Sequence, residues 1–260
     1  MITIKNKQSI EKMAVAGGLL SNILRDIRPL ICAGATTADI DMWIEEQLTK
    51  NGLVSQSKGY HGYRFVSCIS VNDEVVHGIP HKQTILSDGD LIKVDVCAAW
   101  QGYCADMARA FIVGSAVLID SPVQKFIDVA QKALDKGISK AYAGNRLSDI
   151  SFAIQHEVES HGYGIVRDFA GHGIGKKMHE SPEILNYGEP GKGPLLKPGM
   201  AFAIEPMITM GDYSVYVAKD GWTVRTKDKS LAMHVEDTII ITENGPYIIT
   251  RHDQQNMRAL

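Results

Sequence analysis

The chain has 260 residues, of which 45% are hydrophobic and 22% charged, and its net charge is −3. This composition is typical of a globular protein with a sizeable core, and the small negative charge gives no electrostatic reason to expect nucleic acid or an anionic membrane as a partner. No apolar run approaches the ~18 residues of a membrane span. The spacing of the four cysteines fits neither a disulfide framework nor a zinc site. We therefore expect a protein of a reducing compartment, the cytoplasm.

Two amphipathic helices are predicted in the first fifty residues. From Ile10 to Ile27 apolar residues recur at alternating steps of three and four, which is the stripe of an amphipathic helix. No small-residue cleavage site follows it, so we interpret this helix as part of the mature protein rather than as a signal peptide. After a short break, Thr36 or Thr37 caps a second helix that ends at Gly52.

A β-hairpin with one aspartate on each strand is predicted next. Leu91–Ala99 and Tyr103–Val113 are rich in strand-forming residues, and Trp100-Gln101-Gly102 between them is typical of a turn. Asp95 and Asp106 point to the same face if the loop has two or four residues, and to opposite faces if it has three. With a two-residue Trp100-Gln101 loop they would lie directly opposite, with Cβ atoms about 4.5–5.5 Å apart.

The same order of elements returns in the second half of the chain. A third helix is predicted from Ser121-Pro122, a fourth from Leu147 to Gly162, and a strand over Ile165–Ala170. Residues that recur at an offset of 110 are Ala33-Gly34 and Ala143-Gly144, Asp39-Ile40 and Asp149-Ile150, Gly89 and Gly199, and Asp95 and Glu205. This register favours a duplicated helix–helix–strand–hairpin unit around a pseudo-two-fold axis.

From this repeat we expect one α+β domain over residues 1–260, made of two related halves, about 1–115 and 116–260. Helices would cover one face of a curved, mostly antiparallel sheet.

Carboxylates within apolar strand segments indicate a metal site. Asp95 lies between two valines, and Glu205 lies between Ala-Phe-Ala-Ile and Pro-Met, where an uncompensated charge is costly to bury. Asp106 and Glu236 add two more carboxylates, and His172 adds an imidazole within a Gly-His-Gly segment. This oxygen-rich set suits two divalent cations such as Mn, Fe, Co or Mg better than a thiolate-bound zinc. The alternatives are solvated aspartates on an exposed face and a Gly-His-Gly segment in a plain turn.

At these positions the sequence resembles the type I methionine aminopeptidases over essentially its whole length. That family has an Asp, a second Asp eleven residues on, a His in Gly-His-Gly-Ile-Gly, a Glu before Pro-Met and a late Glu. The corresponding residues here are Asp95, Asp106, His172, Glu205 and Glu236. The resemblance implies the pita-bread fold, two divalent metal ions (Co, Mn, Fe, Zn or Mg) and removal of the N-terminal methionine from new proteins whose second residue is small.

The resemblance also implies a role for each matching residue. One metal would be held by Asp95, Asp106 and Glu236, and the other by Asp106, His172, Glu205 and Glu236. His77 and His179 would bind substrate and stabilise the tetrahedral intermediate, while Glu205 would pass a proton. From the residues alone, a loop-capping or surface histidine is the usual interpretation of His77, and His61 and His234 are weaker candidates still.

A pocket for the methionine side chain is implied by the same resemblance. Its lining residues would be Tyr60, Tyr63, Cys68, Met178 and Trp222, for which core packing is the alternative interpretation. Met178 stands where the family usually has Phe, and Ser57 stands where many members have Cys. Cys97 and Cys104 lie two residues from the two aspartates, so we also hypothesise that one of them makes the site sensitive to thiol reagents.

Two other functions compete with this one. An Xaa-Pro aminopeptidase or prolidase would keep the fold and the metals, but such relatives usually carry an extra N-terminal domain. A non-enzymatic protein of the same fold would have lost metal ligands, whereas all five are present here. We therefore expect a methionyl aminopeptidase that acts on nascent polypeptides, is monomeric, associates with the ribosome, and binds neither nucleic acid nor membrane.

Overall fold

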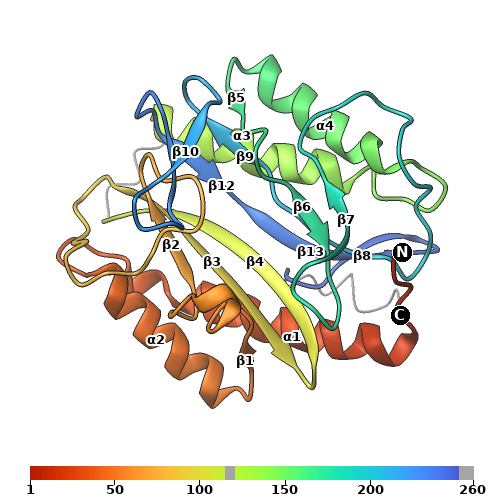
Figure 1. Ribbon diagram of the computed structural model, residues 1–260, viewed down its shortest axis with the longest axis horizontal. Helices are drawn as coiled ribbons and strands as arrows, with labels where there is room; N and C mark the ends of the chain where they lie inside the picture. The colour runs from red at the N-terminus through yellow and green to blue at the C-terminus, as the bar shows by residue number, and fades with distance from the viewer. Residues whose placement is uncertain (115–120, 252–260) are drawn as a thin grey trace.

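A curved antiparallel sheet forms the centre of the molecule (Figure 1), in a computed structural model that describes residues 1–114 and 121–251. Within these residues the sheet has nine strands in the order β1-β3-β4-β13-β8-β6-β7, with β2 also paired to β3 and β14 to β13. The strands are β1 (Val54–Ser55), β2 (Cys68–Val71), β3 (Leu91–Trp100), β4 (Tyr103–Ile112), β6 (Gly171–Gly173), β7 (Glu180–Ile184), β8 (Ala201–Ile204), β13 (Glu236–Thr242) and β14 (Gly245–Ile248). The mostly antiparallel sheet predicted from the sequence is confirmed.

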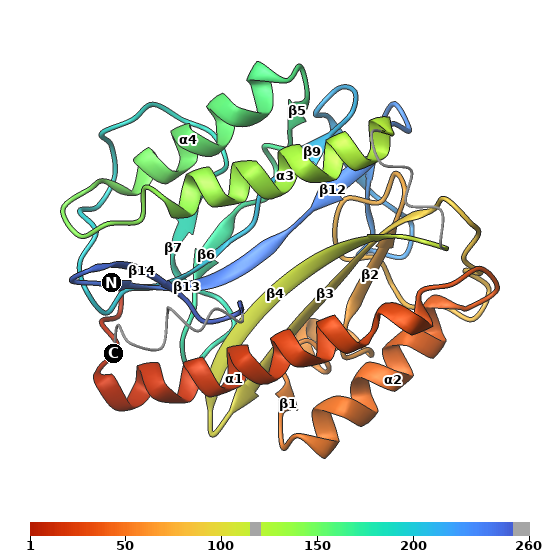
Figure 2. The same cartoon turned by 180° about the vertical axis from the view of Figure 1, so that it is seen from behind.

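In the part of the chain that the structure describes, four α-helices lie on one face of this sheet, as the view from behind shows (Figure 2). They are α1 (Lys7–Asp26), α2 (Thr37–Lys50), α3 (Pro122–Ile138) and α4 (Leu147–Ser160), with short 3-10 turns η1 (Arg28–Leu30) and η2 (Tyr60–Gly62). Side-chain caps set where α2 and α3 begin, since Thr36 accepts from the Asp39 amide and Ser121 accepts from the Gln124 amide. The four predicted helices are thereby confirmed. Across the described ranges, none of the helices combines the length and the apolar character that crossing a membrane would need.

Two small sheets close one end of the molecule. One pairs β10 (Val215–Val217) with β11 (Val224–Thr226), and the other pairs β12 (Ala232–His234), β9 (Met207–Thr209) and β5 (Gly164–Ile165). The predicted strand over Ile165–Ala170 is wrong beyond its first residue. The Val166 amide still donates to the Met207 carbonyl at 3.0 Å, but Arg167 and Asp168 then leave the sheet and line an open cavity.

The β3–β4 hairpin turns one residue later than the Trp100-Gln101 loop considered above. Trp100 pairs with Tyr103, and Gln101 and Gly102 form the turn with φ angles of 48° and 78°. Positive φ at both central residues is the geometry of the tight turn that matches strand twist. Asp95 therefore faces Ala108 and Asp106 faces Cys97, so the two aspartates share a face but are diagonal neighbours rather than directly opposite.

Two hydrophobic cores lie beneath the two helix pairs. The first joins α1 and α2 to β3 and β4, and includes Leu20 and Val96. The second joins α3 and α4 to β8 and β13, and includes Phe126 and Phe202. Each helix pair thus buries its own apolar stripe against its own strands.

Backbone hydrogen bonds recur at the 110-residue offset that the sequence indicated. The Gly34 amide donates to the Leu86 carbonyl at 2.8 Å, and the Gly144 amide donates to the Leu196 carbonyl at 3.0 Å. In the same way, the Thr37 amide donates to the Thr84 carbonyl at 3.1 Å, and the Leu147 amide donates to the Pro194 carbonyl at 3.0 Å. Gly34 and Gly144 also share a left-handed conformation, with φ angles of 88° and 94°. This recurrence supports the proposal that one domain is built from two related halves.

Candidate metal centre

Five adjacent strand segments bring the predicted ligands together. Asp95 lies on β3, Asp106 on β4, His172 on β6, Glu205 directly after β8, and Glu236 at the start of β13. A single cavity of about 120 Å³ is lined by all twelve predicted site residues, namely Tyr60, Tyr63, Cys68, His77, Asp95, Asp106, His172, Met178, His179, Glu205, Trp222 and Glu236. The cavity is also lined by Ser57 and Cys97. The same-face arrangement of Asp95 and Asp106, on which the sequence interpretation depended, therefore holds.

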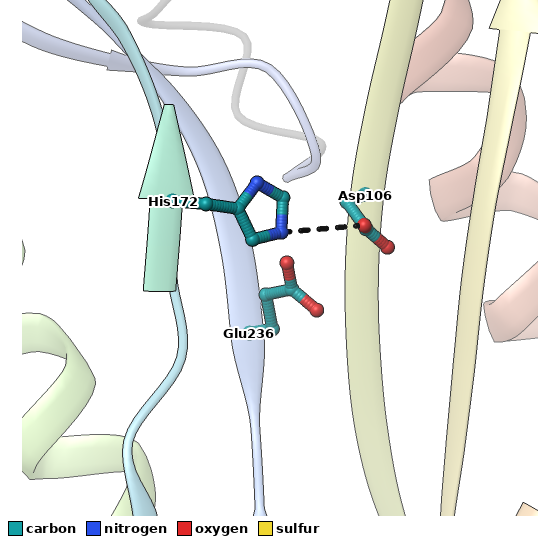
Figure 3. Close-up of side chains that lie close together, drawn as sticks. All are labelled: Asp106, His172 and Glu236. Carbon is teal, nitrogen blue, oxygen red and sulfur yellow. Dashed lines mark ion pairs between the residues drawn. The ribbon is translucent and has the colours of Figure 1, made fainter. Parts of the chain in front are cut away.

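His172 presents an unprotonated nitrogen to the carboxylates. Its Nδ1 lies 3.0 Å from the Gly173 carbonyl oxygen, and because a carbonyl can only accept, Nδ1 carries the proton. The lone pair of Nε2 then faces Asp106 Oδ2 at 3.8 Å and Glu205 Oε1 at 3.6 Å. Figure 3 shows His172, Asp106 and Glu236 converging from three strands. This tautomer is the one that a metal-binding histidine requires.

The carboxylates at the site are buried close to one another. Burial raises the pKa of Asp95, Glu205 and Glu236 well above ordinary values, and the neighbouring carboxylates raise it further. Burial also raises the pKa of Asp106, to about 6. Among the described residues, the buried atoms Asp106 Oδ1 and Glu236 Oε1 find no hydrogen-bond partner. Acceptor atoms that converge in this way fit a divalent cation.

Ligand atoms from three residues lie close enough to share one ion. Asp106, His172 and Glu236 each offer an atom within 4.8 Å of the others, and all three residues are buried. Glu205, His234 and Glu236 form a second such group. Because Glu236 belongs to both groups, the site has the composition of a two-metal centre with a shared carboxylate.

The glycines beside His172 are required by the neighbouring strands. A Cβ at Gly171 would lie 2.5 Å from the Ala203 carbonyl oxygen of β8, and a Cβ at Gly173 would overlap the Ser181 carbonyl of β7. The Gly-His-Gly segment therefore serves close strand packing, which places the imidazole between two strands.

Side-chain hydrogen bonds hold together the strands that carry Asp106 and Glu236. Thr238 Oγ1 accepts from the Asp106 amide at 2.9 Å and donates to the Asp106 carbonyl at 2.7 Å. Arg109 donates to the Glu236 carbonyl at 2.6 Å and to Asp237 Oδ1 at 2.6 Å. These bonds fix the backbone on either side of the site, so the two carboxylates are placed before any ligand binds.

A buried lysine joins three of the segments that surround the site. Lys93, which is 1% exposed, donates from Nζ to the Asn72 carbonyl at 3.1 Å. The same carbonyl accepts from the Ala232 amide at 3.0 Å. Burial lowers the pKa of Lys93 to about 7. One oxygen atom thus connects the strand of Asp95, the loop that leads to His77 and the strand that leads to His234.

The apolar end of the cavity is lined by aromatic and sulfur-containing side chains. The rings of Tyr63 and Trp222 meet edge to face with centroids 4.9 Å apart. Cys68 pairs in register with Asp95, so the apolar end and the carboxylates are adjacent. Met178 packs against the first core, close to the cavity it lines. The cavity therefore has room for a small apolar group directly beside the charged site.

His77 and His179 lie where this cavity meets a larger open one. The larger cavity has a volume of about 600 Å³ and shares His77, His172, His179 and Glu205 with the smaller one. His179 Nδ1 lies 2.9 Å from the Tyr60 hydroxyl. Burial lowers the pKa of His77 to about 4, so it is neutral at physiological pH. A chain that enters through the open cavity would pass these two imidazoles before it reaches the carboxylates.

The sequence interpretation assigned little weight to His234, which the structure places at the site. Its Nε2 lies 3.3 Å from Glu205 Oε2, and the side chain is only 2% exposed. Strand periodicity could have found it, because residues two apart in an extended segment point the same way and His234 precedes Glu236 by two. His61, the other weak candidate, does not line the smaller cavity.

Comparison with known proteins identifies the family. The model of metallopeptidase family M24 matches residues 11–243. A methionine aminopeptidase of Clostridium acetobutylicum is 48% identical over 250 residues, covering 96% of this chain and 99% of that protein. The crystal structure of a methionine aminopeptidase from Thermotoga maritima matches with a TM-score of 0.93 and 44% identity, covering 97% of this chain and 100% of that chain.

A more distant match shows how far the fold extends. The prolidase from Pyrococcus furiosus matches with a TM-score of 0.77 and 24% identity, covering 96% of this chain but 66% of that chain. The pita-bread fold predicted from the sequence is thereby confirmed. The chain belongs to metallopeptidase family M24, and within that family its similarity is to the methionine aminopeptidases, as the sequence motifs predicted.

Proposed function

We propose that this protein is a methionyl aminopeptidase that removes the N-terminal methionine from newly made proteins whose second residue is small. The observation that carries the proposal is the junction of a small apolar cavity with a cluster of buried carboxylates. The similarity to methionine aminopeptidases over 96–97% of the chain supports the same substrate.

The carboxylates and His172 would hold two divalent ions, from among Co, Mn, Fe, Zn and Mg. The proposed ligands of one ion are Asp95, Asp106 and Glu236, and those of the other are Asp106, His172, Glu205 and Glu236. When bound, such ions polarise a peptide carbonyl and activate water for its hydrolysis. The raised pKa values of the four carboxyls supply the physical reason for binding, since a cation offsets their mutual repulsion.

The other residues would orient the substrate and move its protons. Tyr60, Tyr63, Cys68, Met178 and Trp222 would surround the methionine side chain and exclude water from it. His77 and His179 would donate hydrogen bonds to the reacting carbonyl and to the following peptide unit. Glu205, which lines both cavities, would accept a proton from the attacking water and pass it to the leaving amine.

Three further properties complete the proposal. We infer that the protein works in the cytoplasm, acts as a monomer and meets its nascent substrates near the ribosome. The net charge of −3 supports action without binding to nucleic acid or to an anionic membrane.

The proposal is tested with metal-stripped protein to which Mn, Co, Fe or Zn is added back. We expect cleavage of Met-Ala-Ser and not of an Xaa-Pro peptide, and cleavage of the second alone would overturn the assignment. Asp106→Asn and Glu205→Gln should each lower kcat/KM by at least about 100-fold, more than outer-shell changes usually do. Asp26→Asn makes the same chemical change at an exposed carboxyl of α1 and should have no effect.

A further inference from the structure

His234 is a buried side chain at the metal centre to which the proposed function gives no role. It ends β12 two residues before Glu236 and is 2% exposed. Its Nε2 lies 3.3 Å from Glu205 Oε2 and 3.9 Å from Glu236 Oε2. Within residues 1–114 and 121–251, this nitrogen is buried without a well-formed hydrogen bond. A buried polar atom aimed at carboxylates in this way calls for an explanation.

Glu205 lies between two imidazoles, and each of them faces a different oxygen. His172 Nε2 is 3.6 Å from Oε1, on the side of Asp106, while His234 Nε2 is 3.3 Å from Oε2. Since Nδ1 of His172 holds its proton, His172 offers Oε1 only a lone pair. An imidazole ring carries an N–H whether it is neutral or protonated, so Nε2 of His234, which faces Oε2, can donate to that oxygen. The two oxygens of Glu205 are therefore not equivalent.

We propose that His234 is a positioning residue whose Nε2–H donates to Glu205 Oε2. This hydrogen bond occupies Oε2 and leaves Oε1 free to face the metal on the side of His172. A hydrogen bond of this kind orients a metal-binding carboxylate and restricts it to a single oxygen. The inference rests on the proposed metal site, and it adds a determinant of metal affinity and of the direction in which Glu205 points.

The variants His234→Leu and His234→Gln separate this role from simple space filling. Leucine removes the donor, whereas the glutamine amide keeps one. We expect the leucine variant to lose about 10–100-fold in Mn²⁺ affinity or in kcat, the usual loss when an outer-shell partner is removed. KM for Met-Ala-Ser should change little, and glutamine should restore most of the loss. The exposed His156→Gln on α4 is the matched control and should behave as wild type.

Calorimetric titration of metal-free protein with Mn²⁺ measures the affinity without reference to activity. Equal losses in the leucine and glutamine variants would overturn the proposal, as would a leucine variant with wild-type affinity and kcat. The visible spectrum of the Co²⁺ form provides a second test. A wild-type spectrum is expected for the glutamine variant, whereas loss of a nitrogen ligand from that spectrum would make His234 a direct ligand and overturn a positioning role.

Long-range ¹H–¹⁵N NMR of the metal-free protein reports the tautomer directly. The signals of His234, identified by their absence in the glutamine variant, should show the proton on Nε2, and a proton on Nδ1 would contradict the proposal. The tautomer is read on the wild-type chain, and the glutamine variant serves only to identify the signals. If Met-Ala-Ser is not cleaved, the proposed function fails, while the tautomer and the Mn²⁺ affinities still decide the role of His234.

Discussion

Glu180, the residue that follows His179, is hydrogen-bonded to the N-terminal segment. Its Oε2 accepts from Thr3 Oγ1 at 2.6 Å and from Lys5 Nζ at 2.9 Å, and its Oε1 accepts from the Lys176 amide at 2.9 Å. Burial alone would raise the pKa of Glu180, but hydrogen bonds from Thr3 and Lys5 outweigh it and lower the pKa below the ordinary 4.5. The ionised form is thus favoured by folding.

We expect Glu180→Gln to lower the free energy of unfolding at neutral pH by about 1–2 kcal/mol, since bonds to a charged acceptor are lost. A carboxyl whose pKa falls on folding stabilises the protein above its unfolded pKa of 4.5 and loses this effect as the pH drops through the folded value. The difference between the two proteins should therefore shrink below pH 4.5. Thermal unfolding at several pH values measures it, and a difference that is independent of pH would contradict this explanation.

Of the two cysteines beside the aspartates, Cys97 is the one that lines the cavity, which Cys68 lines as well. Cys97 faces Asp106 across the hairpin and lines the cavity, whereas Cys104 does not line it. Burial raises the pKa of Cys97, so its reactive thiolate is scarce. We predict that thiol reagents inactivate the protein slowly, and that Cys97→Ser slows this inactivation further whereas Cys104→Ser does not. Labelling should reach the exposed Cys32 first. Unchanged inactivation of the double Ser variant would rule out this part of the hypothesis.

At the level of single elements, helix α1 packs backbone to backbone against the end of the described chain. A Cβ at Gly17 would overlap the Ile249 carbonyl, whereas a Cβ at Gly18 would meet no atom within 4 Å. Glycine to alanine in a helix normally stabilises by about 0.8–1 kcal/mol. We therefore expect opposite signs from neighbouring positions: Gly18→Ala stabilises, and Gly17→Ala destabilises. Urea unfolding of both variants tests this. If both variants were stabilised, the contact between residue 17 and the Ile249 carbonyl would adjust without loss of stability.

Element boundaries show what the sequence could and could not predict. The helices were predictable because caps and apolar stripes are local signals, as at Thr36 and Ser121. The hairpin turn lies one residue later than a Trp100-Gln101 loop, because Gln101 adopts a positive φ that its residue type does not indicate. The strand after Ile165 was overpredicted, since the apolar residues around Arg167 line a cavity rather than a sheet.

The site itself was predicted through the family resemblance more than through local patterns. The two aspartates followed from hairpin parity, and the Glu205 position followed from the repeat offset. The two-residue spacing places His234 on the face of Glu236, but its contact with Glu205 is long-range, and no sequence spacing relates β12 to the segment after β8. The roles of the twelve residues stay predictions until variants are assayed.

At the scale of the whole molecule, the proposed ligands come from both halves. Asp95 and Asp106 belong to strands of the first core, and His172, Glu205 and Glu236 follow from the second half of the chain. A bound metal would therefore add a link between the two halves, which the pairing of β4 with β13 already joins. At a free metal concentration about 100 times Kd, binding adds about 2.7 kcal/mol to the free energy of unfolding.

Removal of metal with a chelator should accordingly lower the midpoint of thermal unfolding, and adding Mn²⁺ or Co²⁺ should restore it. Asp106→Asn, which removes one of the two proposed shared ligands, should unfold at a temperature that no longer depends on metal. Calorimetric scans with and without chelator measure both. An equal response of wild type and variant to metal would show that the stabilising ion binds elsewhere.

The Asn72 carbonyl oxygen, shared by Lys93 and the Ala232 amide, has a consequence for how mutations combine. Substitutions that disturb any two of the three segments meeting there act on one oxygen atom, so their energies cannot add. Lys93→Met combined with a change in the 232–234 segment should therefore show a coupling energy of about 0.5–3 kcal/mol in a double-mutant cycle. Through this oxygen, a change in one of the three segments alters the effect of a change in another, although they lie far apart along the chain.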